Sequence, residues 1–251
     1  MEINENYLYS LYKAKNTFWY FIEQIENNAV LSYTAVKFKN ENDIYVWLEN
    51  IEYKNNFFEG VLSENNEHKS IPSASVIDWM IVKGDRLIGG YTIRHYRDSL
   101  PEDEKVNFDI DFGLRIDDGN DFFYPDLSTP EGALITLENF YTQKSLDGVL
   151  SCKDFHEEAK NVLLGAEMDL KEELINETAE LLKLAFIENL QKYGMPNFEN
   201  AERVFNRIVY NEKENTALIE EKLIYSDGNN INKFWVSENE KKEWKVLNLV
   251  E

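Results

Sequence analysis

The chain has 251 residues, of which 43% are hydrophobic and 14% aromatic, enough for packed cores and too many for a disordered chain. Its 26 basic and 47 acidic residues give a net charge of −21, which disfavours nucleic acid and anionic membranes as partners. The acidic residues are spread over both halves. They would attract a basic protein partner, although such acidity more often serves solubility alone.

The sequence also indicates where the protein resides. Its single cysteine, Cys152, excludes an intrachain disulfide and is compatible with a reducing compartment. The N-terminus lacks the basic and apolar segments of an export signal, and no run of about eighteen apolar residues could span a membrane. We therefore expect a cytoplasmic protein.

The first half predicts a helix followed by an antiparallel sheet. Apolar residues recur at three- and four-residue steps over Tyr7–Glu26, which is typical of a helix with one buried stripe. Ser63–Ser73 is a predicted loop, and Lys83-Gly84-Asp85-Arg86 is the turn of a predicted hairpin. Alternating apolar segments predict five strands. The strands are Val30–Lys39, Ile44–Tyr53, Phe57–Leu62, Val76–Val82 and Leu87–Tyr96.

A series of short motifs runs through this half, from Phe18-Trp19 to Ile77-Asp78-Trp79 and Gly89–Arg94. Their order resembles the bacterial family called domain of unknown function 2314, over about residues 5–98. The resemblance implies a shape and no known chemistry. One departure is the loop Asn65–Ser75, where the family usually has a Gly-Asp pair that this chain lacks.

Three residues of the first half are predicted to bind a ligand: Asp78, Trp79 and Trp47. Asp78, next to an indole, could take a proton or hold a cationic ligand, or it could simply pair with a residue such as Arg94. Trp47 and Trp79 could form an aromatic platform, although buried tryptophan belongs mainly to cores.

No residue pattern indicates a metal or a cofactor. His68 and His95 have no second ligand at metal spacing, and the acids from Asp109 to Asp121 lack the order of a calcium loop. The glycines Gly84, Gly89 and Gly90 belong to the predicted hairpin, so they do not form a phosphate loop before a helix. We therefore expect neither a metal nor a cofactor.

The acidic stretch Asp98–Asp126, with a predicted strand at Val106–Phe112 and a turn at Asp117-Asp118, separates two predicted domains, residues 1–115 and 116–251. The second domain begins with helices and ends with strands. The predicted helices follow the hydroxyl cap at Ser128-Thr129 and cover Cys152–Leu164 and Leu170–Tyr193. The predicted strands are Arg203–Glu212, Thr216–Ser226, Ile231–Ser237 and Trp244–Val250.

This order of helices before a curled sheet resembles the nuclear transport factor 2-like (SnoaL-like) fold over about residues 127–251. The segments that carry the resemblance are Thr129–Ala133, Phe140-Tyr141, Leu146–Leu150 and Glu243–Val246. The resemblance implies a cone-shaped α+β domain. Its mouth would bind a small molecule, perform acid–base chemistry or, when filled, serve as an interaction surface. The predicted fold class is therefore α+β with two domains.

Four residues near the predicted cone are candidates for chemistry: His156, Tyr141, Arg207 and Tyr210. His156 could act as a general base, but no second acid or amide pairs with it, so a surface histidine is the simpler interpretation. Arg207 could bind an anion or pair with a nearby acid. Because the predicted helices point mainly apolar side chains inwards, we expect a protein that is not an enzyme.

The sequence thus favours a non-catalytic binding protein. One form is an immunity-type protein that neutralises a basic toxin, whose charge would complement the acidic surface. Another is a homodimer, because an open curved sheet commonly pairs with a second copy. The alternative is a small-molecule isomerase or hydratase, or a ligand-binding cone, that uses the C-terminal cavity.

Overall fold

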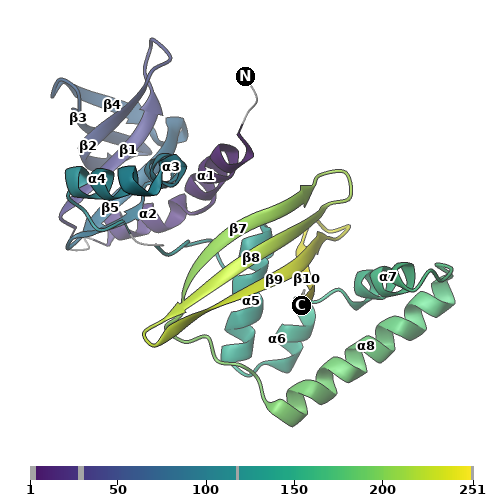
Figure 1. The fold of residues 1–251 in the computed structure, drawn as a ribbon. Helices are drawn as coiled ribbons and strands as arrows, with labels where there is room; N and C mark the ends of the chain where they lie inside the picture. Colours follow the sequence, from purple (N-terminus) through teal and green to yellow (C-terminus); the bar gives the residue numbers. More distant parts are fainter. Residues whose placement is uncertain (1–3, 28–30, 117–118, 250–251) are drawn as a thin grey trace. The chain divides into compact units, whose positions relative to one another are not determined.

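A computed structural model describes residues 4–27, 31–116 and 119–249 of the chain. The chain divides into two units, Met1–Phe122 (unit 1) and Phe123–Glu251 (unit 2), both drawn in Figure 1. Four residues of predicted strands and turns lie outside the described residues: Val30, Asp117, Asp118 and Val250. The α+β class is confirmed for the chain.

Unit 1 contains a six-stranded antiparallel sheet with the order β4-β3-β2-β1-β5-β6. Its strands are β1 (Tyr33–Lys39), β2 (Tyr45–Lys54), β3 (Phe57–Leu62), β4 (His68–Pro72), β5 (Val76–Lys83) and β6 (Arg86–Gly89). Its helices are α1 (Glu5–Asn16), α2 (Phe18–Glu26), α3 (Tyr91–Ser99) and α4 (Glu102–Phe112). A short 3-10 turn, Ser73–Ser75, joins β4 to β5.

The two faces of this sheet carry two apolar clusters, as expected from side chains that alternate along each strand. On one face Val36, Leu48 and Trp79 pack against Ala14 and Phe21 of the first two helices. On the other face the cluster contains apolar side chains of the strands and of α3 and α4. Its members include Ala35, Met80, Trp47, Ile93, Phe108 and Phe112.

The prediction of a strand over Leu87–Tyr96 is wrong beyond Gly89, because the chain turns there into α3. Gly89 and Gly90 have φ of 72° and 63°, a left-handed backbone conformation that residues with a side chain rarely adopt. A Cβ atom on Gly89 would lie 2.5 Å from the carbonyl oxygen of Trp79. The hairpin therefore ends at this glycine pair.

The predicted strand Val106–Phe112 is also wrong, since the segment is the second half of α4. Three acids, Glu102, Asp103 and Glu104, occupy the first turn of this helix, where negative charge is favourable, and Gly113 ends it at a φ of 70°. Two further predictions differ from the structure. The predicted loop Ser63–Ser73 contains β4, and the helix predicted over Tyr7–Glu26 is two helices, α1 and α2, that meet at Thr17.

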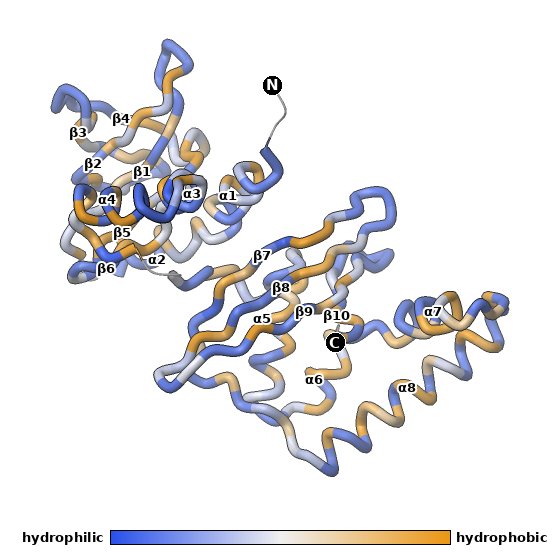
Figure 2. The backbone as a smooth tube through the Cα atoms, in the orientation of Figure 1, coloured by the Kyte–Doolittle hydropathy of each residue, from blue (hydrophilic) through white to orange (hydrophobic). Residues whose placement is uncertain are grey.

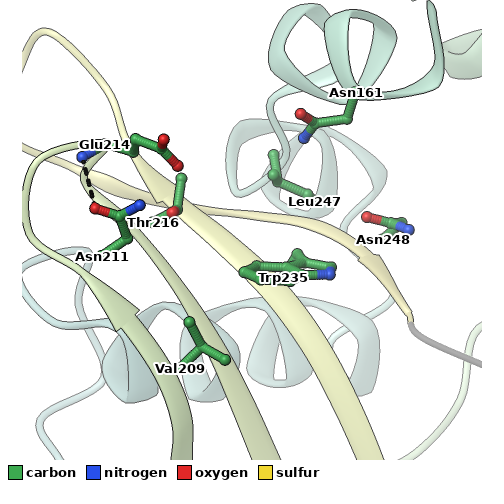
Figure 3. A pocket seen from close by; sticks show the side chains of 8 residues that line it. All are labelled: Asn161, Val209, Asn211, Glu214, Thr216, Trp235, Leu247 and Asn248. Carbon is green, nitrogen blue, oxygen red and sulfur yellow. Dashed lines mark hydrogen bonds between the residues drawn. The ribbon is translucent and has the colours of Figure 1, made fainter. Parts of the chain in front are cut away.

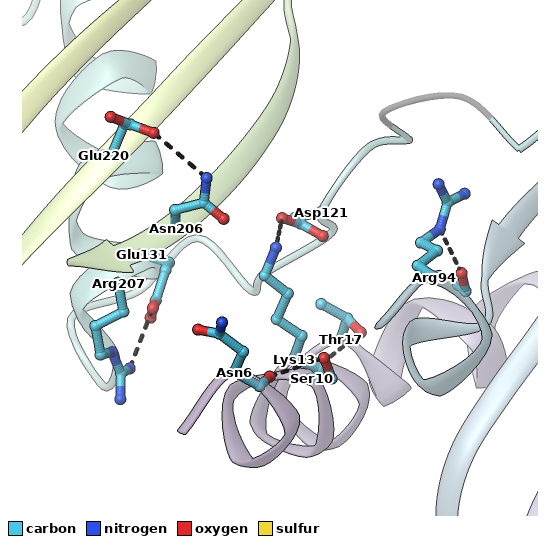
Figure 4. Close-up of polar contacts among 11 residues, drawn as sticks. Asn6, Ser10, Lys13, Thr17, Arg94, Asp121, Glu131, Asn206, Arg207 and Glu220 are labelled. Atoms are coloured by element: carbon cyan, nitrogen blue, oxygen red, sulfur yellow. Dashed lines mark hydrogen bonds and ion pairs between the residues drawn. The ribbon is translucent and has the colours of Figure 1, made fainter. Parts of the chain in front are cut away.

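Unit 1 extends to Phe122 because the segment after residue 118 packs on its first two helices. The buried Lys13 ammonium lies 2.6 Å from the Asp121 carboxylate (Figure 4). The Trp19 indole donates a hydrogen bond of 2.7 Å to the Phe122 carbonyl, and the rings of Tyr20 and Phe122 stack with centroids 3.6 Å apart. These contacts join residues about a hundred positions apart in the sequence.

Unit 2 begins with α5 (Pro130–Thr142), α6 (Leu146–Ser151), α7 (Phe155–Gly165) and α8 (Glu172–Tyr193). A separate antiparallel sheet follows, with β7 (Glu202–Asn211), β8 (Thr216–Tyr225), β9 (Gly228–Glu238) and β10 (Trp244–Leu249) in the order β10-β9-β8-β7.

The four strands predicted for unit 2 are confirmed. The predicted helix start is confirmed too, because Thr129 Oγ1 accepts a hydrogen bond from the Gly132 amide at 3.0 Å. The predicted helix Cys152–Leu164 corresponds to α7, which begins only at Phe155. Helix α5 lies along one face of the sheet (Figure 1).

None of the helices among the described residues is both long and apolar enough to cross a membrane.

Candidate functional site

An open cavity of about 770 Å³ lies on the face of the unit 1 sheet that carries α3 and α4. Five of its lining side chains are aromatic and come from four elements: Tyr33, Trp47, Tyr96, Phe108 and Phe112. We call it the aromatic cavity. A concave, mainly apolar surface with a few polar groups is the usual form of a small-molecule site.

Strand register brings the polar groups of this cavity together. Lys37 of β1 lies opposite Trp47 of β2 and Asp78 of β5, and Ala35 lies opposite Glu49. Because directly paired residues of antiparallel strands point to the same face, all of these side chains are on the cavity side of the sheet. The Lys37 and Glu49 side chains line the cavity itself.

Lys37 is the cation of the aromatic cavity. Its Nζ atom donates a hydrogen bond of 3.0 Å to Thr92 Oγ1 and lies 5.6 Å and 5.7 Å from the ring centroids of Trp47 and Tyr45. Burial lowers the pKa of this ammonium, and the charge of Asp78 opposes that fall. The result is a half-buried ammonium between aromatic rings.

Asp78 is fully buried behind this lysine and holds the start of α3. Its Oδ1 atom accepts hydrogen bonds from the amides of Trp79 (2.8 Å) and Tyr91 (3.2 Å). Its Oδ2 atom accepts hydrogen bonds of 2.7 Å from the amide and from the hydroxyl of Thr92. Burial raises the pKa of Asp78, while the hydrogen bonds from Thr92 and Trp79 and the charge of Lys37 oppose the rise. Asp78 is therefore a positioning residue, which orients the hydroxyl that receives Lys37.

A second polar pair, Tyr33 and Glu49, lines the cavity. Burial raises the pKa of the Tyr33 phenol, and a hydrogen bond to Glu49 and the charge of that carboxylate raise it further. The phenol thus stays protonated and donates to the carboxylate. The cavity combines aromatic walls with one cation and one hydrogen-bonded acid.

The two tryptophans predicted to form a platform lie on opposite faces of the sheet. Trp47 lines the aromatic cavity, whereas Trp79 is fully buried in the other cluster, where its indole donates a hydrogen bond of 3.0 Å to the Ala14 carbonyl. Sequence reasoning missed Lys37, although a lysine within the apolar run Ala35–Phe38 was a usable signal.

The four candidates of unit 2 are only partly brought together. The Arg207 guanidinium lies 4.7 Å from the ring centroid of Tyr210 and 3.1 Å from the Glu131 carboxylate (Figure 4). His156 instead contacts Glu172 at 3.3 Å. The ring of Tyr141 lies 6.2 Å from that of Phe198, and burial raises the pKa of Tyr141 to about 12.

Sequence reasoning also missed a buried acidic cluster in unit 2. Glu138 on α5 and Glu221 on β8 are 4% and 0% exposed, and both approach Arg203 of β7. The Arg203 Nε atom lies 2.5 Å from Glu138 and 3.8 Å from Glu221. Burial raises the pKa of both carboxyl groups, and the charge of Glu138 raises that of Glu221 further, whereas Arg203 opposes both shifts. We call these three residues the Arg203 cluster.

A smaller cavity of about 370 Å³ lies between α7 and the unit 2 sheet (Figure 3). Trp235, Val209 and Leu247 give it an apolar surface. Its polar lining is mostly amide and hydroxyl: Asn161, Asn211, Asn248 and Thr216, with Glu214 alongside. Such groups both donate and accept hydrogen bonds, which suits a neutral polar ligand.

Within the described parts of the chain, no three His, Cys, Asp or Glu side chains come close enough to hold a metal ion.

Comparison with known proteins finds a family model that matches residues 4–116, the part of the chain that contains the aromatic cavity. Residues 4–116 match the family described as "Uncharacterized protein conserved in bacteria (DUF2314)", which confirms the resemblance of the first half. Every residue that lines the aromatic cavity lies within the matched span. Nothing in these comparisons identifies the part of the chain beyond residue 116.

Among curated proteins, this chain is similar to the uncharacterized protein YegJ of Escherichia coli (strain K12). The two are 32% identical over 69 residues, which cover 24% of this chain and 45% of YegJ. The chain therefore spans about half the length of that relative. No solved structure shows a significant match.

Proposed function

We propose that the protein is a non-catalytic binding protein whose unit 1 holds an apolar ligand with an anionic group in the aromatic cavity. The half-buried ammonium of Lys37 at the wall of that cavity carries the proposal. Among the described residues, Lys37 donates one hydrogen bond, to Thr92, so two further N–H groups can reach a carboxylate, sulfonate or phosphate oxygen. The aromatic side chains would cover the apolar part of the ligand.

The contacts of Asp78 favour binding over catalysis. A general base needs a lone pair that can reach the substrate. Both oxygens of Asp78 already accept hydrogen bonds from Trp79, Tyr91 and Thr92, and the residue is fully buried. This carboxylate therefore supports the Lys37 site without facing a ligand.

Replacing Lys37 with methionine is expected to weaken binding of an aromatic anion about tenfold, the loss of one charge-assisted contact worth about 1.4 kcal/mol. The probe is 1-anilinonaphthalene-8-sulfonate, followed by its fluorescence. N-phenyl-1-naphthylamine, which has the same rings and no charge, should bind the K37M variant as it binds the parent protein.

Lys83→Met is the matched control, because Lys83 is an exposed lysine outside the cavity and its loss should leave both affinities unchanged. Trp47→Ala should weaken both probes, since it removes part of the apolar wall. Equal affinity of the anion for K37M and the parent protein would contradict the proposed role of Lys37.

For unit 2 we propose the cone-shaped, nuclear transport factor 2-like arrangement, acting through its surface. Two features support this: α5 packs on a four-stranded antiparallel meander, and the space between them holds buried side chains such as Phe205, Ile219 and Glu221. A crystal structure of the full chain tests the arrangement. An open cavity between α5 and the sheet that holds a small molecule would contradict action through the surface.

A basic protein, such as the toxin bound by an immunity-type protein, is the second candidate partner, favoured by the net charge of −21. Attraction between exposed charges falls steeply with ionic strength. Affinity capture from the host at low salt should therefore recover a partner rich in lysine and arginine and lose it at raised salt. Capture that does not change with salt, or of an acidic partner, would exclude this candidate.

A further inference from the structure

The cavity of about 370 Å³ between α7 and the unit 2 sheet, which we call the Trp235 cavity, lies on the face of that sheet away from α5. Trp235 of β9 and Val209 of β7 both lie opposite Leu218 of β8, and paired residues of antiparallel strands point to one face. Glu221, three positions after Leu218, points to the other face, where α5 packs and the Arg203 cluster lies. The Trp235 cavity is therefore separate from the space between α5 and the sheet.

The indole of Trp235 is the flat apolar surface of this cavity. It is half-buried, and in Figure 3 it lies near the centre of the labelled side chains, with Asn211 and Thr216 to one side and Asn248 to the other. Val209, which is 42% exposed, extends the apolar surface. An aromatic ring surrounded by polar side chains suits a ligand whose faces are apolar and whose edge is polar.

The amide side chains of the cavity keep hydrogen-bonding groups for a ligand. The Asn211 Oδ1 atom accepts hydrogen bonds from the backbone amides of Lys213 (3.2 Å) and Glu214 (3.3 Å). These bonds hold the Asn211 side chain in place and leave its NH₂ group to donate. Within the described ranges of the chain, the side chains of Asn161 and Asn248 make no hydrogen bond to the protein. The cavity thus offers both donors and acceptors.

The charge of the cavity favours a neutral ligand. Among the described residues that line it, Glu214 is the one charged side chain, and the turn that carries it, residues 212–215, is hydrophilic in Figure 2. A phosphate or carboxylate would face this acid and the net charge of −21 without a cation in the lining. Hydroxyl groups, in contrast, donate strong hydrogen bonds to a carboxylate.

We propose that the Trp235 cavity binds a neutral sugar ring, whose C–H face stacks on the Trp235 indole. A sugar ring carries hydroxyl groups around its edge, and the polar side chains come from several elements: Asn161 from α7, Thr216 from β8 and Asn248 from β10. The volume is near the lower end of the about 300–1,000 Å³ of small-molecule sites, which limits the ligand to one or two rings. The proposal does not rest on the aromatic cavity.

The first experiment follows the indole N–H resonance of Trp235 in the full chain by NMR, identified by its absence from Trp235→Phe. The probes are glucose, galactose, mannose and N-acetylglucosamine at up to about 20 mM, where a site with a Kd of about 1 mM is almost full. At least one sugar should move this resonance and leave that of Trp47, in the aromatic cavity, unchanged. The 6-phosphate of that sugar should bind about tenfold more weakly, because it brings negative charge to an acidic site.

The second experiment compares variants through the Kd of the same sugar, measured from its own NMR signals. Asn248→Ala removes a hydrogen-bonding side chain and should raise the Kd about fivefold. Asn230→Ala, the matched control, makes the same change at an exposed position of β9 outside the cavity and should leave the Kd unchanged. Trp235→Ala should raise the Kd about tenfold or more. Circular dichroism establishes that the variants are folded.

A disaccharide that ends in the same ring separates two sources of the ligand, and both results support the proposal. A lower Kd than that of the single ring indicates the end of a glycan chain, and an equal Kd indicates a free sugar. Three results would overturn the proposal: no sugar that moves the Trp235 resonance, a phosphorylated sugar that binds as tightly as the neutral one, or equal Kd values for Asn248→Ala and Asn230→Ala.

Discussion

Replacing Asp78 with alanine is expected to destabilise unit 1 by about 3–5 kcal/mol. The change leaves the buried amides of Trp79, Tyr91 and Thr92 without their acceptor and removes the residue that starts α3. It also removes the acceptor of the Thr92 hydroxyl, which holds Lys37. Denaturant unfolding followed by tryptophan fluorescence measures the loss.

Two companion variants separate capping from the general effect of losing an acid. Asp78→Asn keeps one acceptor oxygen but places an NH₂ group near donors of Thr92, so its cost should be smaller, about 2–3 kcal/mol. Asp111→Asn removes an exposed acid of α4 and should change the free energy of unfolding by less than about 0.5 kcal/mol. Equal stability of D78A and D111N would show that Asp78 does not hold α3.

Replacing Arg203 with methionine is expected to destabilise unit 2 by about 3–5 kcal/mol at neutral pH, because Glu138 and Glu221 stay buried without the cation that faces both. Lys213→Met, which removes an exposed cation from the turn between β7 and β8, should cost less than about 0.5 kcal/mol. Thermal and denaturant unfolding of the full chain compare the two variants.

The same cluster predicts how the stability of unit 2 changes with pH. Folding raises the pKa of Glu138 and Glu221, so between their ordinary and raised values the folded state binds more protons than the unfolded state. The free energy of unfolding should therefore fall as pH rises through that window, the opposite of the usual effect of an acid in an ion pair. The total fall should be larger in Arg203→Met and extend to higher pH, since the guanidinium opposes both upward shifts.

Glu221→Gln tests this assignment directly. Glutamine resembles the protonated form of Glu221, so above the raised pKa the variant should be more stable than the parent protein and depend less on pH. A free energy of unfolding for unit 2 that rises with pH in both the parent protein and Glu221→Gln would contradict the raised pKa values.

The sequence alone determined the elements whose signals are local. The strands β3 and β8 follow from alternation of apolar and polar residues, and the start of α5 follows from Thr129 and Pro130. The sequence also showed the charge of −21, the family resemblance over residues 4–116 and the order of helices before strands in unit 2. These features depend on a few neighbouring residues or on composition.

Only the tertiary structure decided where the apolar run after Gly84 stops being a strand. The run Leu87–Tyr96 alternates well enough for a strand, but the Asp78 carboxylate of the neighbouring strand receives the first amides of α3 and makes a helix more stable there. A contact between residues thirteen or more positions apart leaves no local pattern in the sequence.

The candidate site depended on strand register, which the sequence does not reveal. Lys37 pairs with Trp47 and Asp78, so Trp47 lies in the aromatic cavity and Trp79, the residue after Asp78, lies on the opposite face. A register shifted by one residue would move every side chain of a strand to the other face of the sheet. Likewise, Glu220 and Glu221 are adjacent in β8, and only the packing of α5 and Arg203 makes the second of them the buried acid. The elements that pack against each face of a sheet decide which polar side chains are buried, and this packing exists only in the folded chain.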